Sequence, residues 1–405
     1  MIYCLVDYQF HLLHNTCNMN DFYPDFPKEE FENRYSKARK LMKEKDIDAL
    51  FITERLNYEY FSGHRSEQNA VDKIRSYIFI LPKDDEPTLI TIPFEIAQVE
   101  QTTYFKKFFT TSALFGHPEF ISNTLKKIGL GNAVIGAELG TEQYLGMSYL
   151  GFQEIEKNLS NAKFVDASDI ILKLRLIKSS NEINYIRKAG QISAQAQKET
   201  FSLIHEGMTE NEIAKILRTR LIEHGAEKLS LLCVVSGATP STGIVLLPTD
   251  RVIQKGETVG FDVGVSYKGY WSDLARTASV GPPSEELDEF YSWMMHLRHE
   301  CNLMLQPNKT PAEVIGVCDD IINKRNLKRM GVGRIGHGVG LATTEYPSIA
   351  AFQDIQFKQG MVFACNPNFA NHLGFINAED NWVITENKPD LLSDPVATNK
   401  ILTIE

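Results

Sequence analysis

The sequence lacks several features that would assign it to a particular class of protein. It has no run approaching about 18 apolar residues, so a transmembrane helix is not expected. Its 42 Lys and Arg residues are outnumbered by 52 Asp and Glu residues, and the formal net charge is −10. Without an excess of positive charge, neither nucleic acid nor a membrane is an expected partner.

The six cysteines do not form a C-x-x-C pair, which argues against a zinc ribbon. They are scattered through apolar segments of a large chain, a pattern typical of reduced, mostly buried thiols. Because disulfides are rare in the cytoplasm, the expected location is cytoplasmic.

The length and composition indicate an ordinary globular protein. The chain has 405 residues, of which 43% are hydrophobic and 23% are charged. Domains usually hold roughly 100–200 residues, so two are expected. Residues 1–20 are predicted to be an extension, disordered or a misassigned start, because Met19 offers a second start. We expect a first domain over residues 21–170 and a catalytic domain over residues 171–405.

Helical and strand-like segments alternate in the first domain. A charged helical pattern over residues 28–45 precedes the apolar run 49–52, which has the character of a buried strand. Further strands are predicted at residues 77–81, 88–92 and 133–135. This alternation predicts a small α/β domain.

Long helices and strands are mixed in the second domain. One helix is predicted to begin near Ser179, and another at Thr209, whose capping box reaches Glu212. Further helices are expected near residues 284–305 and 311–326. The predicted strands are residues 231–235, 258–262, 276–280 and 361–365.

Two aspartates of the second domain are placed so that a hairpin would bring them together. Asp262 ends a predicted strand, and Asp273 follows it on the expected return strand. A turn at Lys268 and Gly269 would set the two carboxylates side by side. Strand-end aspartates are commonly solvated turn residues, so this pair alone does not indicate a site.

A histidine and a glutamate further along the chain change that interpretation. His337 lies in a Gly-His-Gly segment, and Glu379 precedes an Asp and a short apolar strand. Two aspartates, one histidine and one glutamate form a hard donor set suited to Mn, Fe, Co or Zn. The glycines at 331, 333 and 336 match G-x-G-x-x-G, but they are better explained as a tight loop that exposes His337.

At this point the sequence resembles the creatinase/prolidase/aminopeptidase P family, the M24 proteins. The resemblance implies an α/β N-terminal domain followed by an α+β catalytic domain with the pita-bread fold. It also implies a homodimer in which the first domain of one subunit contributes to the partner's site. The matching segments are residues 57–63, 174–183, 236–237, 248–253, 256–262, 272–277, 336–338 and 378–380.

The resemblance implies a metal site with one important departure. Asp262 is expected to bind one ion, Asp273 and Glu379 to bridge two, and His337 to bind the second. The family's remaining glutamate is replaced by Asn366. An amide binds metal more weakly than a carboxylate and cannot accept a proton usefully at pH 7. One or two divalent ions are therefore expected, and a metal-free, creatinase-like site stays open.

Two histidines of the family peptidases are also missing. Thr344 occupies one of their places, and the apolar residues 244–247 occupy the other. Glu345 could replace a lost acid or base, and His372 could stand in for a missing base. Thr344 and His372 are both candidates for substrate contact.

Three basic residues complete the set of candidates. Arg276 is expected to brace the carboxylate of Asp273 from behind. His64 and Arg65 follow a turn of the first domain, and both are candidates for substrate contact. Arg65 could hold a substrate carboxylate in the partner's site through a bidentate pair.

We therefore expect a hydrolase that cleaves a C–N bond, of amide or amidine type, in a small molecule bearing a carboxylate. His337, Glu379, Glu345 and Asn366 are its candidate catalytic residues. Three alternatives stay open. They are an Xaa-Pro dipeptidase, a lyase resembling the dimethylsulfoniopropionate lyases, and a metal-free hydrolase or degenerate binding protein.

Overall fold

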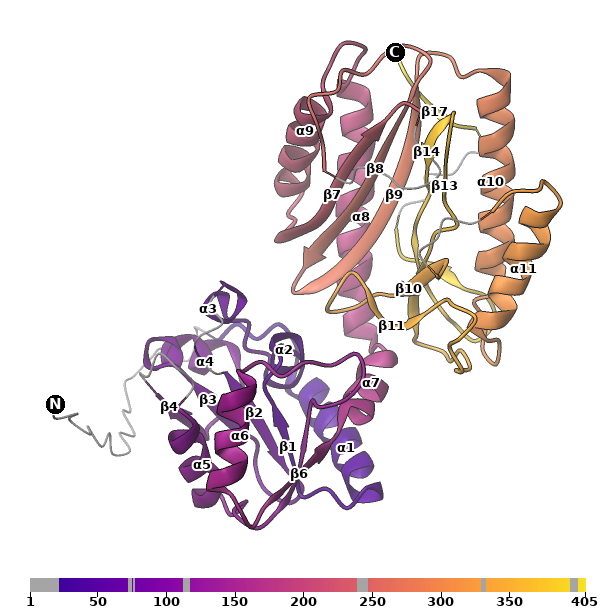
Figure 1. The fold of residues 1–405 in the computed structure, drawn as a ribbon. Helices are drawn as coiled ribbons and strands as arrows, with labels where there is room; N and C mark the ends of the chain where they lie inside the picture. The colour runs from indigo at the N-terminus through magenta and orange to yellow at the C-terminus, as the bar shows by residue number, and fades with distance from the viewer. Residues whose placement is uncertain are drawn as a thin grey trace.

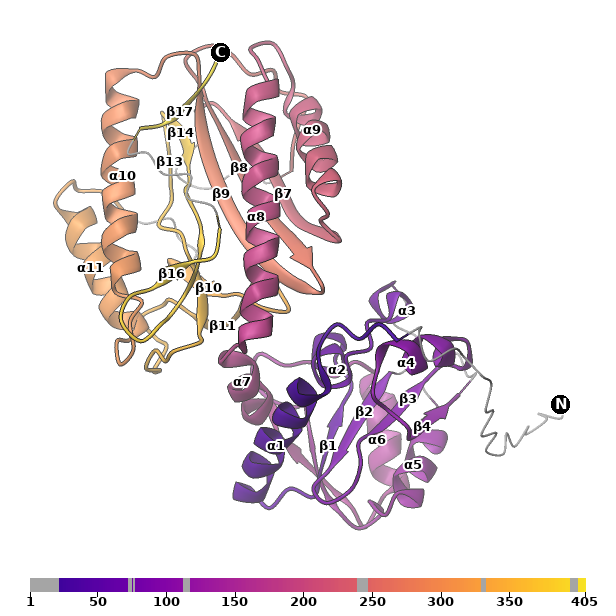
Figure 2. The same ribbon diagram turned by 180° about the vertical axis from the view of Figure 1, so that it is seen from behind.

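The computed structural model describes residues 22–71, 75, 77–111, 117–238, 247–328, 333–393 and 400–405. The predicted extension over residues 1–20 lies outside this part of the chain. The described residues form two bodies joined by α7 (Ser168–Leu176), and Figures 1 and 2 show them from opposite sides. The predicted boundary at residue 170 falls within this helix.

The first body is built on a mixed sheet of six strands in the order β4-β3-β2-β1-β5-β6. Its central strand β1 is antiparallel to β2 and parallel to β5. All four residues of β1 are buried, as expected for a short apolar run covered on both faces. The strands are β1 (Ala49–Ile52), β2 (Ile78–Pro82), β3 (Thr88–Thr91), β4 (Phe108–Thr110), β5 (Val134–Ala137) and β6 (Lys163–Asp166).

Helices cover both faces of this sheet. Leu50 and Ile52 share a core with α1 (Lys28–Glu44) and α7, while Ala49 and Phe51 pack with α5 (Pro118–Lys127) and α6 (Tyr149–Asn158). This alternation is the period of two that a strand imposes. The smaller helical elements are α2 (Arg55–Ser62), α3 (Glu67–Val71), η1 (Pro93–Glu95) and α4 (Ile96–Thr102).

The second body holds its strands between two helix pairs (Figure 1). A four-stranded sheet runs in the order β17-β9-β8-β7, and a five-stranded sheet in the order β11-β10-β12-β15-β16. The strands are β7 (Lys228–Ser236), β8 (Thr258–Tyr267), β9 (Tyr270–Val280), β10 (Gly336–Gly338), β11 (Glu345–Ser348), β12 (Val362–Cys365), β13 (Phe369–Asn371), β14 (Gly374–Ile376), β15 (Asn381–Val383), β16 (Asp390–Leu391) and β17 (Leu402–Ile404).

The helices of this body begin largely where their caps predict. The capping boxes of Ser179 and Thr209 start α8 (Ser180–Leu203) and α9 (Glu210–Glu223), which pack on the four-stranded sheet. On the other side lie α10 (Glu285–Leu303) and α11 (Pro311–Asn323). None of the described helices is long and apolar enough to cross a membrane. Four cysteines are described, and all are free and buried, as predicted: Cys233, Cys301, Cys318 and Cys365.

Candidate functional site

The hairpin of β8 and β9 carries both candidate aspartates. Its turn consists of Lys268 and Gly269, whose φ angles are 53° and 77°, the left-handed values of a tight two-residue hairpin turn. In the resulting register Asp262 lies opposite Ala275, and Asp273 lies opposite Gly264. The predicted hairpin is therefore confirmed, although both strands are longer than expected.

His337 and Glu379 reach the same place from the C-terminal strands. Glu379 forms a bridge with Ala275, the residue opposite Asp262, and its backbone N–H donates to Ala275 O at 3.0 Å. His337 is the middle residue of β10, between β11 and β12. One ligand atom from each of Asp273, His337 and Glu379 lies within 4.8 Å of the other two, and all three residues are buried.

The carboxylates of this cluster are buried close together with few hydrogen-bond partners. Burial raises the pKa of Asp262, and burial together with the other carboxylates raises the pKa of Asp273 and of Glu379. Burial also lowers the pKa of His337 to about 4, so its imidazole is neutral at pH 7. Three buried oxygens, Asp262 Oδ1, Asp273 Oδ1 and Glu379 Oε1, have no hydrogen-bond partner among the described residues. Neutral imidazole and unpaired carboxylate oxygens are the donors that a divalent cation takes, so the residues fit one.

Asparagines supply the polar contacts around these acids. Asn366 lies beside Glu379, and its Nδ2 donates to Glu379 Oε2 at 2.7 Å. The uncharged amide of Asn366 thus holds the carboxylate of Glu379, a candidate metal ligand, and adds no negative charge to the cluster. Asn377 Nδ2 donates to Asp262 Oδ2 at 3.3 Å, and Asn381 bonds both backbone groups of Asp273. The sequence analysis missed Asn377 and Asn381, although both flank Glu379 closely in the chain.

Arg276 does not brace Asp273 as predicted. Its guanidinium pairs with the Asp380 carboxylate and donates to the backbone carbonyls of Ala275 and Glu379. The reason is that side chains alternate between the two faces of a strand. Arg276 lies three residues beyond Asp273 on β9, and side chains at odd spacings point to opposite faces of a strand. Arg276 therefore holds the segment that carries Glu379.

Glu345 is buried in an ion network, which argues against its predicted role as acid or base. Its two oxygens pair with Arg175 and Lys178, and one also accepts the N–H of Ala342. Burial opposes its ionisation, but attraction to Arg175 and Lys178 outweighs burial and lowers the pKa of Glu345. A carboxylate held ionised by two cations is a poor proton carrier.

His64 is enclosed in the core of the first domain. Its side chain is fully buried, and its Nδ1 lies 2.8 Å from the Tyr58 hydroxyl. Burial lowers the pKa of His64 to about 4. This burial argues against the predicted substrate contact, because the residue after the turn folds back onto the core.

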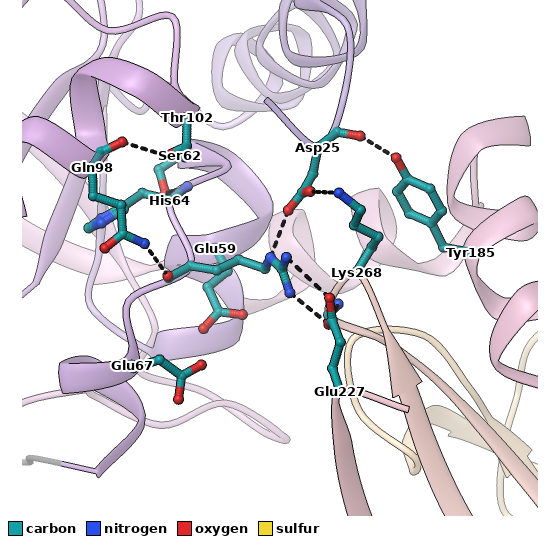
Figure 3. Close-up of polar contacts among 12 residues, drawn as sticks. Asp25, Glu59, Ser62, His64, Glu67, Gln98, Thr102, Tyr185, Glu227 and Lys268 are labelled. Atoms are coloured by element: carbon teal, nitrogen blue, oxygen red, sulfur yellow. Dashed lines mark hydrogen bonds and ion pairs between the residues drawn. The ribbon is translucent and has the colours of Figure 1, made fainter. Parts of the chain in front are cut away.

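Arg65 is committed to contacts between the two domains of its own chain. Its Nε lies 2.7 Å from Asp25 Oδ2, and its Nη1 lies 2.8 Å from Glu227 Oε2. Lys268, at the hairpin turn, also pairs with Asp25 at 2.6 Å. Figure 3 shows Asp25, Glu227 and Lys268 converging there, with His64 set apart. A role for Arg65 in a partner's site stays a prediction.

The two remaining candidates lie at the surface. Thr344 is exposed in the loop before β11. His372 is also exposed, and its Nε2 pairs with Glu286 Oε1 at 2.9 Å near the start of α10. The structure therefore does not bring His372 to the acidic cluster, which argues against its use as a replacement base there.

One basic residue near the cluster was missed by the sequence analysis. Arg334 lies three residues before His337, within the segment interpreted as a glycine loop. Burial and Asp262 raise the pKa of Asp273, and the positive charge of Arg334 opposes that rise. Burial lowers the pKa of His337, and the charge of Arg334 lowers it further. The only available signal was its closeness to His337 in the chain.

Comparison with known proteins gives two family matches. Residues 184–386 match the model of Metallopeptidase family M24, and residues 34–177 match that of the Creatinase/Prolidase N-terminal domain. An Xaa-Pro dipeptidase of Pyrococcus furiosus is 29% identical over 359 residues, which cover 88% of this chain and 96% of that protein. An uncharacterized peptidase of Staphylococcus epidermidis is 27% identical over 361 residues, covering 89% and 98%.

Solved structures agree with the expected fold. The prolidase from Pyrococcus furiosus is 28% identical with a TM-score of 0.76, covering 89% of this chain and 100% of that one. The X-Pro aminopeptidase from Thermotoga maritima MSB8 gives a TM-score of 0.78 at 24% identity, covering 91% and 99%, and this likeness concerns the fold alone. The predicted fold class, an α/β domain followed by a pita-bread domain, is confirmed.

Proposed function

The chain belongs to metallopeptidase family M24, and from that premise we propose that it is a metal-dependent hydrolase of a C–N bond in a small, carboxylate-bearing substrate. The observation that carries the proposal is the set of buried oxygens without partners on Asp262, Asp273 and Glu379, next to the neutral imidazole of His337. The relatives reported above are described as peptidases and lend no support to the lyase alternative.

Asp262, Asp273, His337 and Glu379 are the residues that would hold one or two divalent ions. When bound, such an ion supplies Lewis-acid polarisation of a carbonyl. The protein contributes a dry, preorganised cluster in which Asn377 orients Asp262 and Asn366 orients Glu379. The Arg276 guanidinium fixes the backbone of Glu379 from the opposite face of β9.

Asn366 separates this proposal from ordinary Xaa-Pro cleavage. A carboxylate at this position could both bind an ion and move a proton, whereas the amide donates a hydrogen bond to Glu379 and cannot take up a proton at pH 7. The identity to an Xaa-Pro dipeptidase over most of the chain favours dipeptidase activity as the second candidate.

The first test is metal content and a substrate panel. Elemental analysis of the purified protein should find Mn, Fe, Co or Zn, and the Asp273→Asn variant should lose it. The panel compares Xaa-Pro dipeptides with creatine and other small amide- or amidine-bearing acids. If the native protein contains no stoichiometric metal and the Asp273→Asn variant keeps full activity, the metal-dependent mechanism is refuted.

The second test restores the family residue. We expect Asn366→Glu to raise dipeptidase activity by at least about tenfold, because it returns a proton-accepting group to the cluster. Asn366→Gln is the matched control, since it lengthens the side chain without adding charge. High activity of the native protein on Xaa-Pro dipeptides, unchanged by Asn366→Glu, would favour the dipeptidase candidate instead.

A further inference from the structure

Arg334 lies on the same side of the sheet as the acidic cluster. Its Nη1 donates to Ser348 Oγ at 3.3 Å, and Ser348 is the cross-strand partner of His337 in the β10–β11 pair. Residues directly opposite in an antiparallel pair project their side chains to the same face. The Arg334 Nη1 therefore lies on the face of the sheet to which His337 projects, and the Arg334 charge acts on the imidazole.

The charge of Arg334 is unusual for an arginine in this part of the molecule. Arg65, Arg175 and Arg276 each hold a carboxylate within ion-pair distance. Arg334 has no such partner among the described residues, and its Nη1 donates instead to the Ser348 hydroxyl. Arg334 is half-buried.

The positive charge of Arg334 acts on two acids without forming an ion pair with either. Asp273 belongs to the cluster that a divalent cation fits, and Glu142 is an exposed residue of the first domain. A fixed positive charge beside a cation site weakens metal binding unless an anion also enters. The arrangement is therefore suited to a ligand that brings its own negative charge.

We propose that Arg334 is a specificity-determining residue that binds the carboxylate of the substrate while the C–N bond lies over the Asp262, Asp273, His337 and Glu379 cluster. The inference rests on the proposed function and names the anchoring group that it lacks. The planar guanidinium offers the carboxylate two parallel N–H donors, which a lysine cannot do. A neutral amide in place of the carboxylate loses the charge and one acceptor.

The test compares an Xaa-Pro dipeptide with its C-terminal amide. In the native protein KM should be lower for the acid than for the amide. Arg334→Gln should raise KM for the acid by about 10- to 100-fold, with a smaller change in kcat, and leave KM for the amide almost unchanged. Arg334→Lys should give an intermediate value, and Arg325→Gln, on an exposed arginine of the same chain, should change neither.

A binding measurement separates this inference from the proposed function. Titration calorimetry of L-proline and L-prolinamide into Mn²⁺-loaded protein should show a preference for the acid that Arg334→Gln removes. That result without any hydrolysis supports the inference and defeats the proposed function. Equal losses on acid and amide, an unchanged preference in Arg334→Gln, or binding of neither probe would overturn the inference. If Glu142→Gln also removes the preference for the acid, the inference is overturned, because Arg334 then acts through its interaction with the first domain.

Discussion

Asp380 is a buried acid directly after the candidate ligand Glu379. It lies between the guanidinium groups of Arg276 and Arg298, and it also accepts the Ser393 hydroxyl at 2.6 Å. Burial opposes its ionisation, but the two arginines outweigh burial and lower the pKa of Asp380. The residue after Glu379 is thus anchored by two arginines whose side chains are themselves buried.

Removing one of these arginines should be costly. We expect Arg276→Gln to lower the free energy of unfolding by about 3–5 kcal/mol, because it leaves charged groups buried with fewer partners. Urea unfolding at pH 7 measures the change. Arg325→Gln is the control, since its ion pair with Glu289 is exposed and should contribute less than about 1 kcal/mol. Equal effects of the two substitutions would contradict the buried role.

For single residues, the sequence indicated the candidate metal ligands better than it indicated the residues that hold them in place. Asp262, Asp273, His337 and Glu379 stand in short recognisable segments, so they could be chosen before any contact was known. The partners of Arg276 and Glu345 lie 104 and 170 residues away in the chain, respectively. Such pairings depend on how whole elements pack, and no local pattern encodes them.

The elements that meet between the two domains form a second ion network. Arg175 at the end of α7 donates to Asn57 of α2 at 2.7 Å and pairs with Glu345 of β11. Lys178 supplies a second cation at 3.4 Å from the same carboxylate. The strand next to His337 is therefore joined to the first domain by charges with little exposure to water.

Glu345→Gln should show the pH dependence of that network. Because the folded-state pKa lies below the ordinary value of 4.5, the ionised carboxylate stabilises the protein above that pH and loses this effect as pH falls. The native protein should exceed the variant by about 3–5 kcal/mol at pH 7, and the difference should shrink below pH 4.5.

Urea unfolding of both proteins at pH 7 and pH 4 is the measurement. Glu289→Gln, which removes an exposed acid, should lower stability by less than about 1 kcal/mol at either pH. A difference between native protein and Glu345→Gln that is the same at both pH values would be inconsistent with the lowered pKa.

Elements were predicted well where a local signal exists. The capping boxes of Ser179 and Thr209 and the turn at Lys268 and Gly269 are written in consecutive residues. The short strands β10 and β11, of three and four residues, escaped notice because they carry no hydrophobic period of their own. They form because β10 pairs with β12 on one side and with β11 on the other.

For the whole molecule, the cluster of buried acids links metal to folding stability. A cation that binds only the folded state stabilises it by about 2.7 kcal/mol at 100 times its Kd, which corresponds to a rise in Tm on the order of 5 °C. We expect Mn²⁺ added to chelator-treated protein to produce such a rise in a scanning calorimeter, and chelation to reverse it.

Asp273→Asn is the informative variant in that experiment. Replacing one buried carboxylate by an amide relieves repulsion within the cluster, so the metal-free variant should melt no lower than the metal-free native protein. It should also gain little from Mn²⁺. If none of Mn, Fe, Co and Zn changes the Tm of the native protein, the unpaired oxygens are not metal ligands.

The β8–β9 hairpin has a mechanical consequence for the molecule. Its tip, Lys268, is tied to Asp25 of the first domain, while its middle carries both Asp262 and Asp273. The turn of the hairpin is therefore fixed to the first domain, while its strands belong to the second. A rotation of the first domain would therefore act, through the Lys268–Asp25 ion pair, on the two strands that carry those acids.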